Sequence, residues 1–385
     1  MKKKLKELAT LVNGYAFKSI NYCDTGIRII RIANVKDGYV SDESPCYYPL
    51  EFEQKLGSAM LKENDLLMSL TGNVGRVALL AKNFLPAGLN QRVECIRPYD
   101  NDMTEYLFYY FRSKIFVDEV TSATTGCAQQ NLSIKWLENH PIPIYCIKQR
   151  TDIVNELKKL DKVIDIKRQQ LTSLNNLVKS RFIEMFGTFP NNEKSWETGT
   201  IRDIVTDVRY GTSRKAAEGN TGKYRYLRMN NITYDGHLDL SNIKTIDIPE
   251  NEVEKCSVKY GDILFNRTNS CELVGKTCVY NRTEMMILAG FIIRVRVNER
   301  IRPEFLAAFL NTDFSKQMLL GMCKKAIGQA NINAQEMQNI GIYIPPIELQ
   351  NEFVNFVKQI DKSKFVYLFN PNIFYGSFSR FHHLP

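Results

Sequence analysis

The chain has 385 residues, of which 44% are apolar and 24% are charged. This length exceeds that of a single ordinary core and predicts two or three domains, and the composition excludes an intrinsically disordered chain. The formal net charge of +9 favours a polyanionic partner such as nucleic acid, although a mildly basic surface also serves solubility alone.

Cysteine usage and the start of the chain predict a cytoplasmic protein. The nine cysteines include no CxxC pair, and the four histidines do not complete a zinc set, so we expect reduced thiols and no bound metal. The basic start MKKKLKELATL is not followed by an apolar run of signal-peptide length, and no stretch approaches the length of a membrane-spanning helix. We therefore expect no membrane contact.

The first 145 residues read mainly as short strands and turns. Apolar or alternating runs such as RIIRIANV, DLLMSL and VECIR are separated by Gly, Asn, Asp and Pro, which is typical of strands joined by tight turns. A helix is expected at 104–113, and another at 303–312 in the second half of the chain.

A long helix is predicted from about residue 151 to residue 186, with Gly187 at its end. The three- and four-residue spacing of a heptad seam, interrupted at Lys167, runs through Leu157, Leu160, Ile164, Leu171, Leu174 and Val178. Such a helix would be a rod of roughly 50 Å. It is either a spacer that needs a partner helix or an ordinary long core helix, and the candidate partner carries Phe353, Val357 and Ile360.

The two halves of the chain repeat the same order of segments at an offset near two hundred residues, which indicates an internal duplication. The matching segments are 5–19 with 201–215, 28–38 with 225–236, 65–76 with 262–276, 87–97 with 289–297, 126–144 with 328–346, and 149–162 with 350–364.

Side chains able to contact DNA bases, sugars or phosphates cluster in the loops of both halves. The candidates are Tyr15, Lys18, Arg28, Arg31, Lys36, Thr71, Arg76, Arg209, Tyr210, Ser213, Arg214, Lys215, Arg225, Arg228, Arg267 and Lys276. Weaker candidates are Gln129, Gln130, Asn131, Gln329 and Asn331. For any single residue, an ordinary solvated surface position is the alternative. The loop with Gly72 and Gly75 is equally consistent with a phosphate contact and with a tight turn.

No segment carries a convincing catalytic motif. Asn370 to Phe374 differ from the Asn-Pro-Pro-aromatic loop of amino-methyltransferases, and no Gly-rich cofactor turn accompanies them. Two short Glu-x-Lys matches, at Glu53 and Glu156, are expected by chance, and no P-loop for ATP is present. We expect a non-catalytic chain.

The chain resembles the specificity subunits of Type I restriction-modification systems in three features. The first is the internal duplication, and the second is the segment 65–76 with its echo at 262–276, in which an apolar strand is followed by Thr-Gly or Thr-Asn. The third is the pair of segments PIPIYCIKQRTDIVNELKKLDK and PPIELQNEFVNFVKQIDK, in which prolines precede a helix. The resemblance implies an α+β fold in which two similar mixed α/β target-recognition domains, 1–145 and 195–345, are joined by helices at 146–187 and 346–366. These helices would form an antiparallel coiled coil in an internal pseudo-twofold repeat. The chain would read a split target in double-stranded DNA.

The resemblance also implies which chemistry belongs to partner proteins. Methylation subunits would bind S-adenosylmethionine, and a motor-nuclease restriction subunit would use ATP and Mg²⁺, so no cofactor is expected in this chain. The aromatic segment 367–385 departs from the family, because the second helix is expected to match the first in length. The alternative function is therefore a free-standing DNA-binding or interaction protein, a truncated specificity subunit that does not direct modification.

Overall fold

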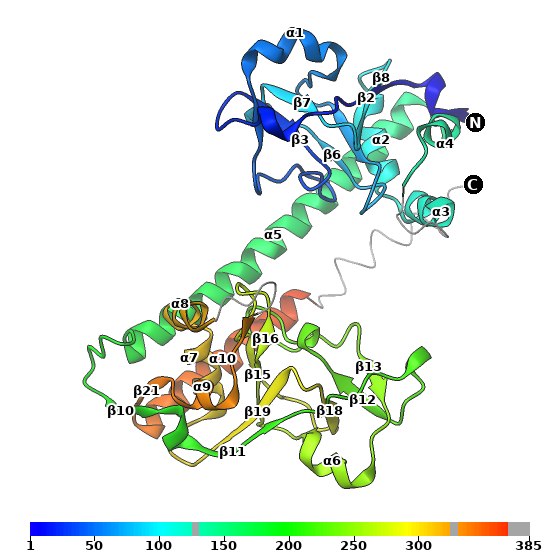
Figure 1. Cartoon of the computed structure of the whole chain (residues 1–385). Coiled ribbons are helices and arrows are strands. Elements are labelled where there is room, and N and C mark those ends of the chain that lie inside the picture. The colour runs from blue at the N-terminus through cyan, green and yellow to red at the C-terminus, as the bar shows by residue number, and fades with distance from the viewer. Residues whose placement is uncertain (125–130, 324–329, 369–385) are drawn as a thin grey trace. The chain divides into compact units, whose positions relative to one another are not determined.

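The computed structural model describes residues 1–124, 131–323 and 330–368, which belong to two compact units, Met1–Asp165 (unit 1) and Ile166–Pro385 (unit 2) (Figure 1). Gln129, Gln130, Gln329 and the segment from Phe369 onward lie outside the described residues, as does the rejected motif at Asn370 to Phe374.

The centre of unit 1 is a four-stranded antiparallel sheet in the order β2-β8-β5-β6. Its strands are β2 (Ala9–Asn13), β8 (Val93–Pro98), β5 (Leu66–Ser69) and β6 (Val77–Leu79). Leu66 and Met68 pack on one face of the sheet and Leu67 on the other, because successive side chains of a strand alternate. Every residue of β5 is buried, which explains why its sequence is apolar without alternation.

Each face of this sheet is covered by a different layer. The helices that cover the face of Leu66 and Met68 are α2 (Met103–Phe111), α3 (Lys114–Thr124) and α4 (Ile134–Asn139). The opposite face packs against a second sheet of order β4-β3-β7. That sheet and the remaining elements of unit 1 are β3 (Ile27–Ile30), β4 (Tyr47–Tyr48), β7 (Ala87–Leu89), α1 (Glu53–Leu56), β1 (Lys2–Lys4) and β9 (Pro141–Pro143), the last two paired with each other.

Unit 2 repeats this architecture. Its central sheet has the order β11-β19-β15-β17, with β11 (Val205–Tyr210), β19 (Ile292–Val297), β15 (Ile263–Asn266) and β17 (Thr277–Val279). The covering helices are α7 (Pro303–Leu310), α8 (Asp313–Met322) and α9 (Ala334–Gln338). The other elements are β10 (Glu197–Thr200), β12 (Tyr224–Leu227), β13 (Lys244–Ile246), α6 (Glu250–Cys256), β14 (Ser257–Val258), β16 (Thr268–Asn269), β18 (Met286–Leu288), β20 (Ala330–Asn331) and β21 (Gly341–Ile344).

Backbone hydrogen bonds align the two units residue by residue. The Leu5 amide donates to the His140 carbonyl at 3.1 Å, as the Ile201 amide does to Ile340 at 2.9 Å. An irregularity between Val205 and Asp207 then adds one residue to β11 relative to β2. The difference in residue number between equivalent positions of the two strands therefore grows from 196 to 197. The predicted register of 87–97 with 289–297 is wrong: Ala87 and Gly88 lie within β7, whereas Ala289 and Gly290 follow β18, and Leu89 corresponds to Leu288.

Helix α5 (Ile147–Phe186) contributes residues to both units. Within unit 1 it is joined to the α2 region by the ion pairs Arg150–Asp102, Lys158–Glu105 and Arg112–Asp161, and Val154 enters the core. The predicted seam residues Leu157 and Leu160 are half-buried there, and Ile164 is exposed.

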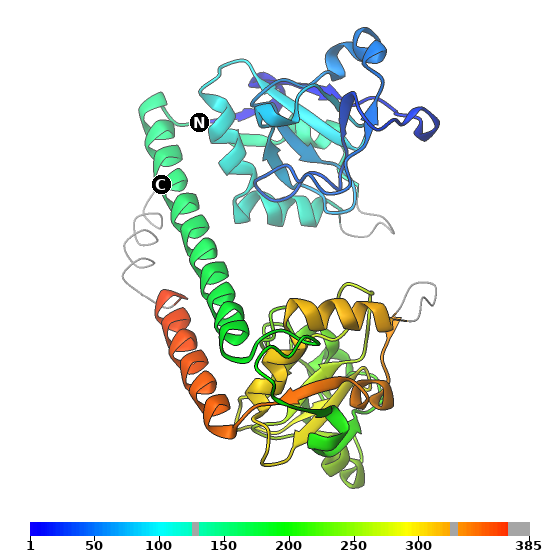
Figure 2. The same ribbon diagram turned by 90° about the vertical axis from the view of Figure 1, so that its left-hand side faces the viewer.

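Within unit 2, α5 packs antiparallel against α10 (Ile347–Leu368), and Figure 2 shows the two helices side by side. The Phe182 and Phe353 rings are 5.4 Å apart, and Val178 and Val357 pack against the same core. The predicted partner helix is therefore present, with Ile360 also buried and Leu171 and Leu174 half-buried. The described α10 has 22 residues and α5 has 40.

Candidate nucleic-acid interface

Four loop segments of unit 1 meet at one end of the central sheet. The Tyr15 amide donates to Leu89 and the Gln91 amide to Tyr15, while the Leu70 amide donates to Arg92 and the Leu132 amide to Leu70. We call these segments the loop strip of unit 1; they are Asn13–Tyr15, Leu70–Asn73, Asn90–Arg92 and Asn131–Leu132. These long-range hydrogen bonds hold four segments that are distant in the sequence next to one another, so their side chains lie on one surface.

Unit 2 has the same loop strip. The Thr212 amide donates to Leu288 and the Gly290 amide to Thr212, while the Arg267 amide donates to Phe291 and the Ile332 amide to Arg267. The segments are Tyr210–Thr212, Arg267–Ser270, Ala289–Phe291 and Asn331–Ile332. The weaker candidates Asn131 and Asn331 belong to the two strips, where they pair with Thr71 and Thr268.

In each strip a glycine allows two backbone segments to approach closely: Gly14 lies against Asn90, and Gly211 lies against Leu288. A Cβ on Gly14 would lie 2.2 Å from the Asn90 carbonyl carbon, and one on Gly211 would lie 2.1 Å from the Leu288 oxygen. Real side chains do not tolerate such contacts, so the two segments approach closely only because glycine stands at both positions.

The strip of unit 1 exposes side-chain types that contact bases. Asn13, Gln91 and Arg92 are exposed, Asn90 is half-buried, and Tyr15 packs edge-on against Phe17 with ring centroids 5.1 Å apart. Amides suit adenine and guanidinium groups suit guanine. Of these residues only Tyr15 was predicted from the sequence, although the run LNQR carries three of the other four between two buried strands.

Most of the predicted cations already have a partner within their own unit. In unit 1, Arg31 donates to the Ser44 carbonyl at 2.6 Å, and Lys36 pairs with Glu43 at 3.1 Å. The pairings in unit 2 are Arg209 with Asp207, Arg214 with Glu252, Arg225 with Glu284, and Arg228 with the Asn242 carbonyl. These side chains already bond within the folded unit. A contact with DNA would therefore have to replace these hydrogen bonds and ion pairs or use donors that they leave free.

Two predicted cations are buried, in contrast to the expected exposed positions. Arg28 is 8% exposed, pairs with Asp42 and lies over the Phe84 ring. Lys276 is 7% exposed, and its ammonium donates to the Met229 carbonyl at 3.0 Å. Burial lowers the pKa of Lys276. The ammonium of Lys276 thus bonds within unit 2, and a contact between Lys276 and DNA stays a prediction.

The loop after β5 is a tight turn. Gly72 and Gly75 have φ of 72° and 80°, a conformation that favours glycine, and the Gly75 amide donates to the Ser69 carbonyl at 2.9 Å. The turn leaves Thr71 and Arg76 half-buried. A contact between these two residues and DNA stays a prediction.

Among the described residues, four of the predicted cations have no hydrogen-bonded or ion-paired side-chain partner: Lys18, Arg76, Lys215 and Arg267. Lys18, Ser213 and Lys215 are exposed. Ser213 and Lys215 lie one and three residues after the strip segment that ends at Thr212. Arg267 lies over the ring of Tyr210, with its guanidinium carbon 4.8 Å from the ring centroid.

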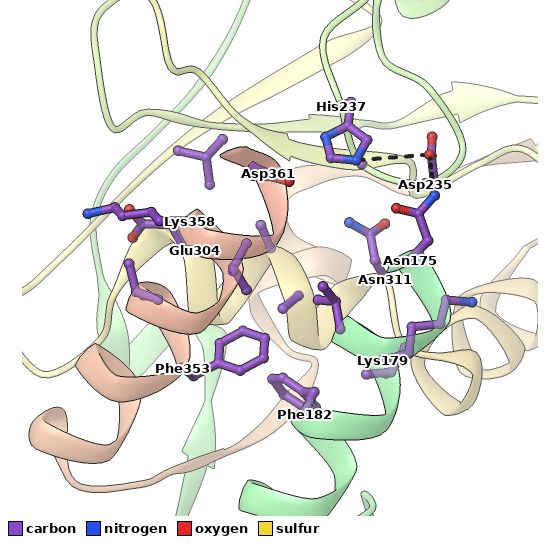
Figure 3. Close-up of a pocket in the computed structure, with 18 of the residues that line it drawn as sticks. Asn175, Lys179, Phe182, Asp235, His237, Glu304, Asn311, Phe353, Lys358 and Asp361 are labelled. Carbon is purple, nitrogen blue, oxygen red and sulfur yellow. Dashed lines mark hydrogen bonds and ion pairs between the residues drawn. The ribbon is translucent and has the colours of Figure 1, made fainter. Parts of the chain in front are cut away.

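A pocket of about 360 Å³ lies within unit 2, between α5, α7, α10 and the loop at Tyr234–His237 (Figure 3). Several of its polar groups already have a partner in unit 2: Asn175 donates to Asp235 at 3.1 Å, and Lys179 pairs with Asp313 at 2.8 Å. Lys316 donates to the Gly275 carbonyl at 2.8 Å, and burial lowers the pKa of Lys316 to about 7. The pocket thus lies where the two helices join the rest of unit 2, away from the loop strip.

Within the part of the chain that the structure describes, no group of three or more His, Cys, Asp or Glu side chains is placed to hold a metal ion. No described helix is both long and apolar enough to cross a membrane.

Taken together, the repeated sheets, the two matching loop strips and the paired helices define a DNA-recognition protein built from two similar units. A family model described as the Type I restriction modification DNA specificity domain matches residues 1–176 and again 193–365. The chain therefore belongs to this family and carries two copies of the domain. The predicted α+β fold and the predicted resemblance are confirmed, and the chain is a specificity subunit that recognises the DNA target of a Type I restriction-modification system.

Individual relatives are distant in sequence. The chain is 22% identical over 375 residues to the EcoKI specificity subunit of Escherichia coli K12, covering 92% of this chain and 80% of that protein. It is 28% identical over 172 residues to the MjaVIII specificity subunit of Methanocaldococcus jannaschii, covering 43% and 40%. The crystal structure of an S subunit from M. genitalium aligns over 95% of this chain and 90% of that chain, at 16% identity and a TM-score of 0.47.

Proposed function

We propose that each unit recognises one half of a split double-stranded DNA target through its loop strip. The observation that carries this proposal is the repetition of the strip: the same four segments, tied by equivalent hydrogen bonds, occur once in each unit with different exposed side chains. Two equal scaffolds with unequal side chains suit two different half-sites.

Helix α5 is proposed to set the gap between the half-sites. A 40-residue helix spans about 60 Å, compared with 34–36 Å for one turn of duplex. Its first part is joined to unit 1 by ion pairs, and its last turns are packed into the core of unit 2 through Phe182 and Phe186. Such attachments at both ends would pass the length of the helix on to the spacing of the two readers.

Methylation and cleavage are proposed to belong to partners. The chain would bind methylation subunits that carry S-adenosylmethionine and a restriction subunit that uses ATP and Mg²⁺, all in the cytoplasm, and would itself be non-catalytic. Support comes from the family assignment and from the loop strips, whose side chains are suited to recognition. The exposed apolar side chains of α5, among them the seam residue Ile164, are a candidate docking surface for a methylation subunit.

The test is to co-express the chain with a methylation subunit encoded beside it and to map methylated bases genome-wide by single-molecule sequencing. A split motif with one fixed gap is expected. Soluble protein that yields no motif, and that does not co-purify with the methylation subunit, would instead support the alternative of a free-standing DNA-binding protein.

The spacer role has its own test, in which seven residues are inserted between Asp165 and Ile166. Seven residues keep the phase of the heptad and lengthen the helix by about 10 Å, which is close to three base-pair steps of 3.4 Å. The gap in the motif should grow by about three base pairs while both half-sites stay unchanged. An unchanged gap would remove α5 from the role of spacer.

A further inference from the structure

The Arg267 and Tyr210 side chains form the most pre-organised cationic group in either loop strip. The Arg267 guanidinium carbon lies 4.8 Å from the Tyr210 ring centroid. The hydroxyl of Tyr210 accepts a hydrogen bond from the Ala334 amide at 2.8 Å, at the start of α9. The ring is thus held by its backbone at one end and by a hydrogen bond at the other, and it supports the guanidinium from one side.

The hydrogen-bond donors of Arg267 are not used by the described chain. No described carboxylate or carbonyl accepts from its side chain, and its Nε is buried without a partner. This distinguishes Arg267 from Arg209, Arg214, Arg225 and Arg228, each of which binds an acceptor in its own unit. A guanidinium that lies over an anchored ring and lacks an acceptor is suited to two parallel hydrogen bonds with an external group.

The surroundings of Arg267 favour a base as that group. Its backbone is part of the strip, where its carbonyl accepts from the Ile332 amide at 2.9 Å and its amide donates to Phe291 at 3.0 Å. The exposed Asn331 and the half-buried Asn269 stand beside it on β20 and β16. Amide groups next to a planar guanidinium form a surface for base edges, whereas a phosphate needs only a nearby cation.

Unit 1 cannot reproduce this contact. The backbone bonds of Arg267 match those of Leu70, whose amide donates to Arg92 and whose carbonyl accepts from Leu132. Leu70 is 6% exposed and packs in the core of unit 1, and Asn13 occupies the position of Tyr210. The two units therefore differ at one equivalent point of the strip, with a planar donor pair in one and an apolar side chain in the other.

We propose that Arg267, held over the ring of Tyr210, recognises a guanine in the half-site of unit 2, an inference that rests on the proposed function of the loop strips. The two N–H groups on one edge of the guanidinium would donate to the O6 and N7 atoms of that guanine in the major groove. The half-site of unit 1 is read without an equivalent contact, so the two half-sites differ.

The experiment compares the motif of the wild-type complex with the motifs of Arg267→Ala and Arg267→Lys complexes, all mapped by genome-wide methylation. One half-site should lose its requirement for a G·C pair at one position, while the other half-site and the gap stay as they were. Binding titrations with duplexes substituted at that position should show discrimination falling by about 5- to 150-fold in Arg267→Ala. Arg267→Lys should lose part of it, because an ammonium is a single point of charge.

A matched pair of Tyr210 variants tests the platform. Tyr210→Phe keeps the ring but loses the hydrogen bond from the Ala334 amide, so it should keep most of the discrimination at this position, whereas Tyr210→Leu should relax the same position as Arg267→Ala. Lys215→Ala is the control, an exposed cation near the strip whose loss should weaken binding to all sequences alike.

Each outcome decides the inference. A wild-type motif without a G·C pair in either half-site would overturn it at once, and so would an unchanged motif with uniformly weaker methylation in Arg267→Ala, which indicates a phosphate contact. If the Arg267→Ala complex does not methylate DNA, the Arg267→Lys complex decides. Wild-type discrimination for the G·C pair by Arg267→Lys would overturn the inference, and reduced discrimination would support it. The proposed function fails separately, when the wild-type complex produces no split motif.

Discussion

Arg97 and Asp65 form a two-pronged ion pair, with Nε and Nη2 of the arginine 2.9 and 2.7 Å from the two carboxylate oxygens. Arg296 and Asp262 repeat it in unit 2 at 2.7 and 3.2 Å. In each unit the aspartate also accepts from the backbone amide three residues before it, so it joins the start of one central strand to the end of its neighbour.

Replacing Asp262 by asparagine should destabilise unit 2 by about 3 kcal/mol, because the side chain is almost fully buried and Arg296 would lose the nearer of its two charge partners, keeping only Asp207 at 3.8 Å. Hydrogen exchange followed by mass spectrometry should show faster exchange in β15 and β19 with unit 1 unaffected. The control is Glu250→Gln, which removes an exposed partner of Lys223 and should leave exchange unchanged. Equal effects of both variants would contradict the role of the buried pair.

Glu94 is 0% exposed on β8, and neither carboxylate oxygen has a hydrogen-bond partner among the described residues. Burial, together with the charge of Glu138, raises the pKa of Glu94 from 4.5 to about 8. The folded state therefore favours the protonated form, and the unfolded state ionises first as pH rises. The stability of unit 1 should fall between about pH 4.5 and pH 8 and level off above the folded pKa.

The Glu94→Gln variant should remove this dependence. The advantage in its free energy of unfolding over the wild type should grow from below about 1 kcal/mol at pH 5 to about 4–5 kcal/mol at pH 8.5, as measured by urea unfolding. Glu94→Ile is the matched second variant, because Ile293 occupies the equivalent position in β19. A difference that is constant across this pH range would exclude Glu94 as the titrating group.

The helix pair of unit 2 depends on Phe353, which is fully buried against Phe182 and Phe186. Phe353→Ala should lower the free energy of unfolding of unit 2 by about 3–5 kcal/mol, through lost burial and a residual cavity. Leu177→Ala, on α5 but 47% exposed, should change it little. Thermal unfolding of both variants measures the difference, and a loss from Leu177→Ala as large as that from Phe353→Ala would contradict the special role of the buried phenylalanine cluster.

Exposed and buried cations should differ in their effect on DNA affinity. Lys215→Ala should reduce the slope of log affinity against log salt by about 1 if the side chain neutralises one phosphate. Arg28→Met should lower the stability of unit 1 instead and leave the slope unchanged, because Arg28 is buried and paired with Asp42. Titrations of labelled duplex at several salt concentrations check both expectations, and a changed slope in Arg28→Met would contradict them.

Local patterns in the sequence were sufficient for the duplication, for the long helix and for the existence of its partner. The heptad spacing from Leu157 to Val178 predicted α5, and Phe353 and Val357 predicted the helix that packs on it, because periodic burial of side chains repeats along a single segment. The family resemblance followed from the order of these elements.

The loop strips and the state of each cation were decided by the tertiary structure alone. Asn13, Gln91 and Asn131 are far apart in the sequence, and long-range backbone hydrogen bonds bring them to one end of the sheet. Arg267 directly follows β15 and Lys276 directly precedes β17, yet one lies over Tyr210 without an acceptor while the other is buried against the Met229 carbonyl. Residue type and local spacing do not encode such partners, because hydrogen bonds and burial depend on which distant segments the fold brings together.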